Sequence, residues 1–145
     1  MAMSAATLKG YREICGLTQQ ALADLAGVSI MAVKKWEKGE REVPADVSDL
    51  VLSRYARHCR WVDEIIDNIP ETGEPSVVSI EYFRSQEQAD IASERDTGVM
   101  GSKAFSYQEM NAAARSAAEI LMDSGQLVVF NYPDSEDAIR AKGVS

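Results

Sequence analysis

The first forty residues contain short runs of apolar positions three and four apart, each followed by a glycine. Across residues 5–15 the apolar positions are Leu8, Tyr11, Ile14 and Cys15, a spacing that predicts an amphipathic helix. The glycines that follow the successive runs are Gly16, Gly27 and Gly39. Because glycine favours the position just after a helix, the pattern predicts three short helices before residue 40.

The second and third of these helices have clear starting signals. Thr18 and Ser29 precede them, and hydroxyl side chains at such positions cap free backbone amides. In the second helix we expect Leu22, Leu25 and Ala26 to face one side. In the third we expect Val33 and Trp36 to face the core.

A longer apolar stripe follows Pro44, a residue that suits the first turn of a helix. It consists of Val47, Val51, Tyr55, His58, Val62, Ile65 and Ile69. Neither glycine nor proline interrupts residues 45–69, which predicts one long helix or two helices in line. The stripe is longer than a small helical domain needs, so part of it is available for a partner chain.

The second half of the chain changes character. Residues 68–76 hold two prolines and a glycine among polar residues and are predicted to form a linker. Residues 77–83 and 126–132 are rich in β-branched and aromatic side chains, as strands are. Between them we predict a polar helix over 84–96, a loop, and a strong helix over 106–125. In the strong helix Ser106 and Glu109 form a capping box, and Gly125 marks the end.

The predicted fold class is α+β, with two domains. Residues 1–67 form an all-α domain, residues 68–76 a linker, residues 77–132 a strand–helix–helix–strand domain and residues 133–145 a polar tail. Two strands bury little surface by themselves, and a unit of this size is marginally stable alone. We therefore expect residues 77–132 to pair with a second copy of the chain.

Charge separates the same two halves. The whole chain has a net charge of -8, but residues 1–62 carry nine basic and seven acidic side chains, giving +2. Residues 63–145 carry six basic and sixteen acidic side chains, giving -10. Opposite charge in adjoining segments indicates two different roles, and only the first half suits a polyanionic partner.

The string between residues 12 and 39 resembles the lambda-repressor/Cro-type helix-turn-helix family, also called the XRE family. The resemblance covers roughly residues 6–55, and its matching elements are Arg12, "GLTQQALADLAGVS" (residues 16–29), Val33 and "WEKG" (residues 36–39). Ala23 and Gly27 supply the small residue at the helix contact and the turn residue that tolerates positive φ. The resemblance implies DNA binding, and it implies a structural ion pair between Arg12 and Glu37.

The resemblance also implies which residues face DNA. The N-terminal part of the second helix of the motif contacts base edges in the major groove, which assigns base contacts to Ile30, Met31, Ala32 and Lys35. Ser29, the cap of this helix, is also expected among the DNA-binding residues. The start of the first helix approaches a phosphate, which assigns this role to Thr18, Gln19 and Gln20. Further phosphate contacts fall to Lys34, Lys38 and Arg41.

The base-contacting positions depart from the usual pattern of the family. Many members place Gln, Ser, Arg or Asn there, which can form bidentate hydrogen bonds to bases. Ile30, Met31 and Ala32 can contact thymine methyl groups, and Lys35 is then the best candidate for a polar contact to guanine. DNA shape could supply the remaining selectivity. The alternative is that Ile30 and Met31 pack against protein and the motif no longer binds DNA.

Other kinds of site find little support. His58 lies on the long apolar stripe, and Cys15 and Cys59 lie within helical patterns, so we interpret all three as packed side chains. The acidic residues between 63 and 74 are expected to form a solvated face, so we predict no metal site and no cofactor. The Gly-Ser-Lys at 101–103 lacks the spacing of a phosphate-binding loop. With no nucleophile, base or metal set visible, we do not expect an enzyme.

These patterns favour a cytoplasmic, homodimeric transcription regulator, most simply an autorepressor, because no membrane span or signal peptide is present in the sequence. The order of elements also resembles a group of small regulators that includes anti-CRISPR-associated repressors. Two alternatives stay open. One is an antitoxin whose C-terminal half holds a toxin protein, and the other is a protein-binding adaptor with a vestigial helix-turn-helix.

Overall fold

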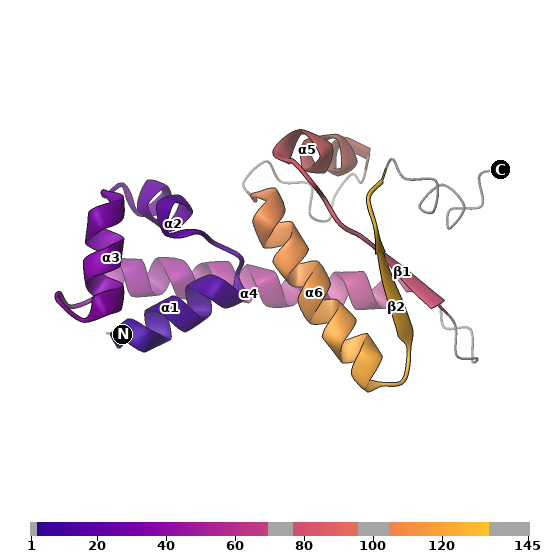
Figure 1. The fold of residues 1–145 in the computed structure, drawn as a ribbon, viewed down its shortest axis with the longest axis horizontal. Helices are drawn as coiled ribbons and strands as arrows, with labels where there is room; N and C mark the ends of the chain where they lie inside the picture. Colours follow the sequence, from indigo (N-terminus) through magenta and orange to yellow (C-terminus); the bar gives the residue numbers. More distant parts are fainter. Residues whose placement is uncertain (1–2, 70–76, 96–104, 134–145) are drawn as a thin grey trace. The chain divides into compact units, whose positions relative to one another are not determined.

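The computed structural model describes residues 3–69, 77–95 and 105–133, which form a mixed α+β fold that is mostly helical. In chain order, the elements drawn in Figure 1 are α1 (Ala5–Ile14), α2 (Gln19–Ala26), α3 (Ile30–Lys38), α4 (Ala45–Asp67), β1 (Val77–Glu81), α5 (Gln86–Arg95), α6 (Tyr107–Asp123) and β2 (Leu127–Asn131). Each predicted helix and strand is present, with ends that shift by a few residues. The stripe from Val47 to Ile65 lies on one continuous helix, α4, and Ile69 lies just beyond its end.

Contacts divide the chain into two units, Met1–His58 and Cys59–Ser145. The boundary falls inside α4, earlier than residue 67, where the sequence analysis placed the end of the first domain. Trp61 and Val62 belong to the core of the second unit. Helical periodicity shows that a stripe is buried, but it does not show which core buries it. Most of the predicted linker and the tail after Pro133 lie outside the described residues.

The helices of the first unit begin and end where the sequence predicts. The hydroxyl of Thr18 accepts a hydrogen bond from the amide of Ala21 at 2.9 Å, and that of Ser29 accepts from Ala32 at 3.3 Å. Gly27 and Gly39 end α2 and α3 with φ of 70° and 78°. Side chains other than glycine rarely adopt this left-handed conformation, so these two glycines fix the length of both helices.

The core of the first unit consists of large apolar side chains packed from all four helices. Leu8, Leu22, Val33 and Val51 are completely buried, and Trp36 is 5% exposed. Of the three residues expected on one side of α2, Leu22 is completely buried, Ala26 is half-buried and Leu25 is 40% exposed. In this eight-residue helix the buried residues are Leu22 and Ala23.

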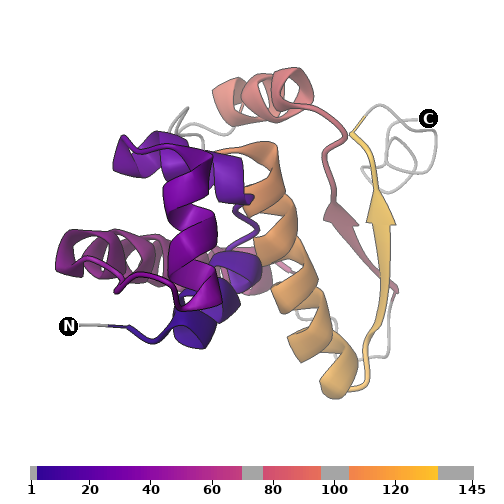
Figure 2. The same cartoon turned by 60° about the vertical axis from the view of Figure 1, so that its left-hand side comes forward.

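The second unit is built on a two-stranded parallel sheet. β1 and β2 pair in a register that runs from Val77 opposite Leu127 to Glu81 opposite Asn131. A parallel pair needs a long crossover between its strands, and α5 and α6 provide it. Figures 1 and 2 show α6 lying alongside the sheet. One face of the sheet is therefore covered by a helix of its own chain.

Small side chains allow α6 to pack closely within this unit. Ala113, Ala114, Ala117 and Ala118 are all at most 2% exposed. The predicted capping box is present, because the amide of Ser106 donates to Glu109 Oε2 at 2.9 Å and the amide of Glu109 donates to the Ser106 hydroxyl at 3.2 Å. The capping box therefore starts α6 at the position that its sequence predicts, and the helix packs through its buried alanine face.

Candidate nucleic-acid interface

The pair formed by α2 and α3 is set by a short turn. Gly27 ends α2, and the amide of Val28 donates to the carbonyl of Ala23 at 3.0 Å, which folds the chain back. Ser29 then caps α3. Ala23 is completely buried, as expected for a small residue where two helices cross closely. These contacts form the helix-turn-helix geometry that the sequence predicts.

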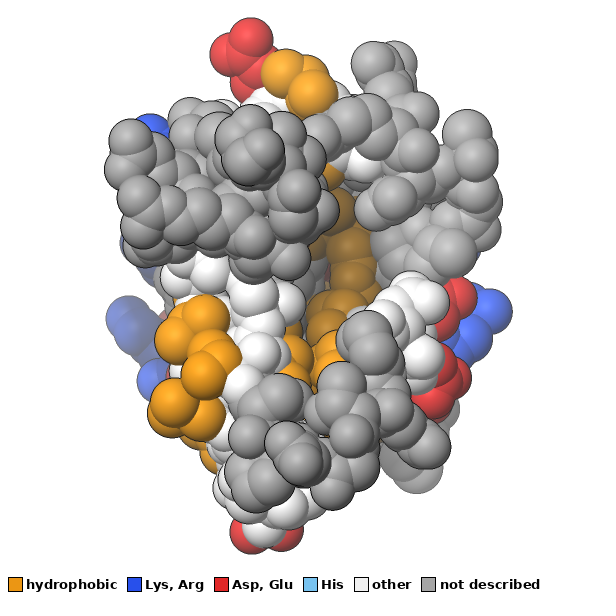
Figure 3. All heavy atoms as spheres, turned by 90° about the vertical axis from the view of Figure 1, so that its right-hand side faces the viewer, with side chains coloured by type: hydrophobic (Ala, Val, Ile, Leu, Met, Phe, Trp, Pro, Cys, Tyr) orange, Lys and Arg blue, Asp and Glu red, His pale blue; other side chains and the backbone are white. Residues whose placement is uncertain are grey.

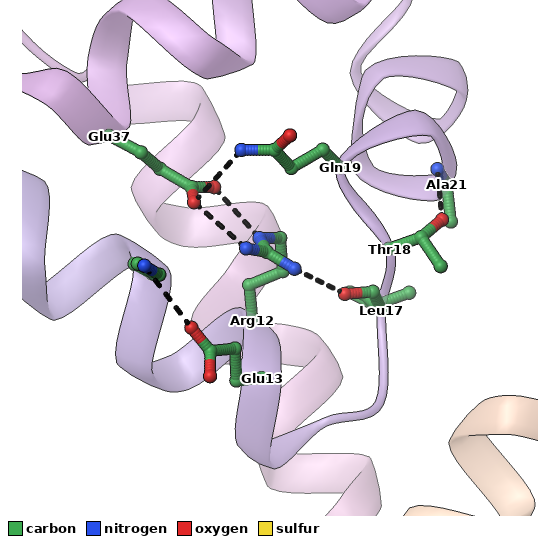
Figure 4. Close-up of polar contacts among 8 residues, drawn as sticks. Arg12, Glu13, Leu17, Thr18, Gln19, Ala21 and Glu37 are labelled. Carbon is green, nitrogen blue, oxygen red and sulfur yellow. Dashed lines mark hydrogen bonds and ion pairs between the residues drawn. The ribbon is translucent and has the colours of Figure 1, made fainter.

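A buried ion pair holds α3 against the rest of the unit (Figure 4). Arg12 Nε and Nη2 donate to Oε2 and Oε1 of Glu37, each at 2.8 Å. The two side chains are only 10% and 4% exposed. Bidentate pairs between guanidinium and carboxylate are among the strongest and most directional polar contacts in proteins. The structure thus contains the ion pair that the family resemblance implies, between α1 and α3.

Two further contacts extend this pair, and sequence spacing gave no sign of them. Arg12 Nη1 donates to the carbonyl oxygen of Leu17 at 2.8 Å, and Gln19 Nε2 donates to Glu37 Oε1 at 3.4 Å. The network therefore joins the end of α1, the start of α2 and the end of α3. Gln19 is part of the scaffold as well as a predicted phosphate contact.

The two sides of α3 differ in chemistry. Val33 is completely buried, Trp36 is 5% exposed, and Ile30 and Ala32 are half-buried against the same core. The opposite side carries residues at helical spacings of three, four and seven, which share one face. These residues are Met31, Lys34, Lys35 and Lys38. We call this set the Met31–Lys38 face.

Exposure along the Met31–Lys38 face is uneven. Met31 is 53% exposed, Lys38 is exposed, and Lys34 and Lys35 are half-buried. Of the three apolar residues predicted to contact bases, Met31 is therefore the one whose side chain is mainly open to solvent. Ile30 and Ala32 are half-buried and pack against the core on the side of α3 that carries Val33 and Trp36.

The remaining predicted contact residues lie around α2 and after α3. Thr18, Gln20, Ser29 and Arg41 are exposed. Gln20 Nε2 donates to Asp24 Oδ1 at 2.8 Å, so its amide already has one partner on α2. Glu40 and Glu42 flank Arg41, which weakens the positive charge after α3. The strongest concentration of positive charge among these residues is on α3 itself.

A family model described as "Helix-turn-helix" matches residues 8–62 of the chain. No curated protein matches the chain. Together with the geometry above, the match makes the N-terminal part of the chain a helix-turn-helix domain of the XRE, or lambda-repressor, type. It supports a DNA-binding transcription regulator of this type. Within the described residues, no helix has the length and apolarity needed to cross a bilayer.

Proposed function

We propose that the protein is a homodimeric repressor, most simply of its own gene, that acts in the cytoplasm and contacts a palindromic operator through residues 29–38. The observation that carries this proposal is the Met31–Lys38 face, on a helix held in place by the buried Arg12–Glu37 pair. A recognition helix enters the major groove with its N-terminal residues at the base edges. In this chain Met31 lies at that end of the face, and Lys35 follows about one turn later.

Phosphate contacts come from both sides of the recognition helix. The exposed N-terminus of α2 presents Thr18 to Gln20, and backbone amides at a helix N-terminus attract phosphate oxygens. Lys34, Lys38 and Arg41 add positive charge near the groove. Contacts of this kind set the position of the protein on DNA and make its affinity depend on salt.

Dimerisation is the role that we propose for the second unit. On the sheet face turned away from its core, Val77 is 60%, Leu127 63% and Val129 39% exposed, whereas Val78 and Val128 on the other face are buried. Figure 3 shows hydrophobic side chains open to solvent on the side of the molecule that it views. Exposed apolar groups of this size are typical of an interaction surface. β2 also carries no charged residue, so two copies could approach here despite the acidity of the unit.

A dimer would explain how a weakly basic domain binds DNA tightly enough to regulate transcription. Each copy brings few cations, and linking two copies makes the second binding event intramolecular. The operator should then contain two half-sites about one or two helical turns apart. The acidic second unit should face away from the duplex.

Selection of bound DNA from a random pool, followed by sequencing, tests this proposal. We expect a palindrome. On that palindrome, a Lys35→Ala, Lys38→Ala double variant should show strongly weakened gel retardation. Lys9→Ala is the matched control, because it removes a lysine from the exposed surface of α1. Unchanged retardation by the double variant would contradict contact through α3 and favour the adaptor with a vestigial motif.

The exposed sheet face also fits a second function, that of an antitoxin. In this case the same apolar surface would hold a toxin protein, and the first unit would bind DNA as described. Co-purification with the product of a neighbouring gene, at one copy of each chain, would favour the antitoxin. A homodimer that purifies alone and binds its operator would favour the repressor.

A further inference from the structure

We propose that Met31 selects base pairs that carry a methyl group in the major groove, so that the protein detects the methyl group itself, on thymine or on 5-methylcytosine. This inference rests on the proposed DNA binding through α3 and concerns what that helix recognises. Its basis is the position of one exposed thioether side chain among lysines, at the end of α3 that approaches base edges.

Met31 has a distinct position on this helix. It lies in the first turn of α3, is 53% exposed, and has Lys34 and Lys35 three and four residues further along the same face. Ile30 and Ala32, its neighbours, are packed against the core of the unit. Met31 is therefore the apolar side chain that is mainly exposed at the start of α3, where Ile30 and Ala32 are half-buried.

The polar side chains near this end are poorly suited to distinguish bases by hydrogen bonds. Helix α3 contains no Asn, Gln or Arg, and its lysines, which can contact guanine, follow the first turn. The Ser29 hydroxyl accepts from the backbone of Ala32. Gln19 and Gln20 donate to Glu37 and Asp24. At the first turn of α3, the interaction left to distinguish bases is an apolar contact through Met31.

Among the four bases, thymine alone presents a methyl group in the major groove. An apolar side chain distinguishes thymine from cytosine by burying this group, with no hydrogen bond to the base. Methylation of cytosine at C5 places a methyl group at the same position of the ring. A protein that uses Met31 in this way should therefore accept 5-methylcytosine better than cytosine, whereas a protein using hydrogen bonds to the base would not follow the methyl group.

The test uses the operator obtained from the random pool. Each thymine of one half-site is replaced in turn by deoxyuridine, which removes the methyl group and leaves the hydrogen-bonding edges unchanged. At one position we expect affinity to fall about fourfold, the effect of losing one buried methyl group. At the same position, 5-methylcytosine should bind about fourfold more tightly than cytosine.

Met31→Ala assigns the effect to this residue. In this variant we expect the thymine–deoxyuridine difference to disappear, as it should when two groups in contact are removed together. Met122→Ala is the matched control, because Met122 is 47% exposed on α6 in the second unit, and it should retain the full difference.

Two results would overturn the inference alone. In the first, no deoxyuridine substitution changes the affinity of the unaltered protein. In the second, Met31→Ala keeps the fourfold difference. In both results the protein still binds its operator, so the proposed function stands. Failure to select any DNA, by contrast, would refute the proposed function and this inference with it.

Discussion

The two units of this protein differ in how completely they bury their apolar side chains. Among the described residues, the first unit exposes Ile14, Leu25 and Met31 as large hydrophobic side chains. The second exposes eight, namely Val77, Ile91, Ile120, Met122, Leu127, Val129, Phe130 and Tyr132. Soluble monomers carry scattered apolar groups, but a concentration on one small sheet needs an explanation.

The buried cores of the two units also differ in composition. The first unit packs leucine, valine and tryptophan around the buried Arg12–Glu37 pair. The second packs six alanines, together with larger side chains such as Trp61, Ile80 and Phe83, against a two-stranded sheet. Small side chains bring elements close together but remove little apolar surface from water. The open sheet face therefore distinguishes the second unit from the first, and it is the surface that we propose to pair with a second copy of the chain.

The two tryptophans of the chain allow the units to be observed separately. Trp36 lies in the core of the first unit and Trp61 in the core of the second. A Trp61→Phe background therefore reports unfolding of the first unit by fluorescence. A Trp36→Phe background reports unfolding of the second.

The largest expected effect comes from breaking the ion pair of the first unit. Arg12→Ala leaves Glu37 buried without its bidentate partner and should lower the free energy of unfolding by about 3–5 kcal/mol. Urea unfolding in the Trp61→Phe background measures this loss. Lys9→Ala is the control, since its 3.9 Å pair with Glu13 is largely exposed and should matter little. An equal loss in the Trp36→Phe background would show that the units do not unfold separately.

The corresponding polar contact of the second unit is buried Asn111. Its Oδ1 accepts from the amide of Phe83 at 2.8 Å, and its Nδ2 donates to the Phe83 carbonyl at 2.7 Å. Asn111→Ala leaves both backbone groups unpaired and should cost about 2–4 kcal/mol, measured in the Trp36→Phe background. Asn131→Ala removes an exposed hydrogen bond to Ser79 and should cost far less. A small effect of Asn111→Ala would mean that water replaces the amide.

A charge on the open sheet face tests whether the second unit needs a partner copy. Val129→Lys should weaken dimerisation about tenfold or more, because a charged side chain opposes burial of this strand. Sedimentation equilibrium measures the change. Ile91→Lys introduces the same charge at a side chain that is 53% exposed on α5, and it should leave dimerisation intact. If the two variants dimerise equally well, the sheet face is not the interface.

The smallest expected effect has opposite signs at two glycines of the first unit. A Cβ atom added to Gly10, inside α1, meets no atom within 4 Å, so Gly10→Ala should stabilise the unit by about 0.5–1 kcal/mol. Gly27 has a φ of +70°, so Gly27→Ala should destabilise it by about 1 kcal/mol. Thermal unfolding in the Trp61→Phe background measures both. The Trp61 signal in the other background should not change.

Local signals in the sequence predicted most of the elements. Hydroxyl caps at Thr18, Ser29 and Ser106, and left-handed glycines at Gly27 and Gly39, act within one turn of the backbone that they end. The strands at residues 77–81 and 127–131 were also visible in the pattern. The candidate interface was predicted as a segment, because a recognition helix is defined by such local features and by the spacing of its motif.

The tertiary structure decided which side of each helix is buried and by which core. It half-buried Ile30 and Ala32, left Leu25 and Met31 exposed, and assigned the end of α4 to the second unit. It also set the parallel register of β1 and β2. Residue spacing specifies a periodicity, but the direction in which a helix or strand faces depends on neighbours far away in the chain. The sequence by itself therefore determined which elements form and, within a few residues, where they end, and packing determined which side chains each element exposes.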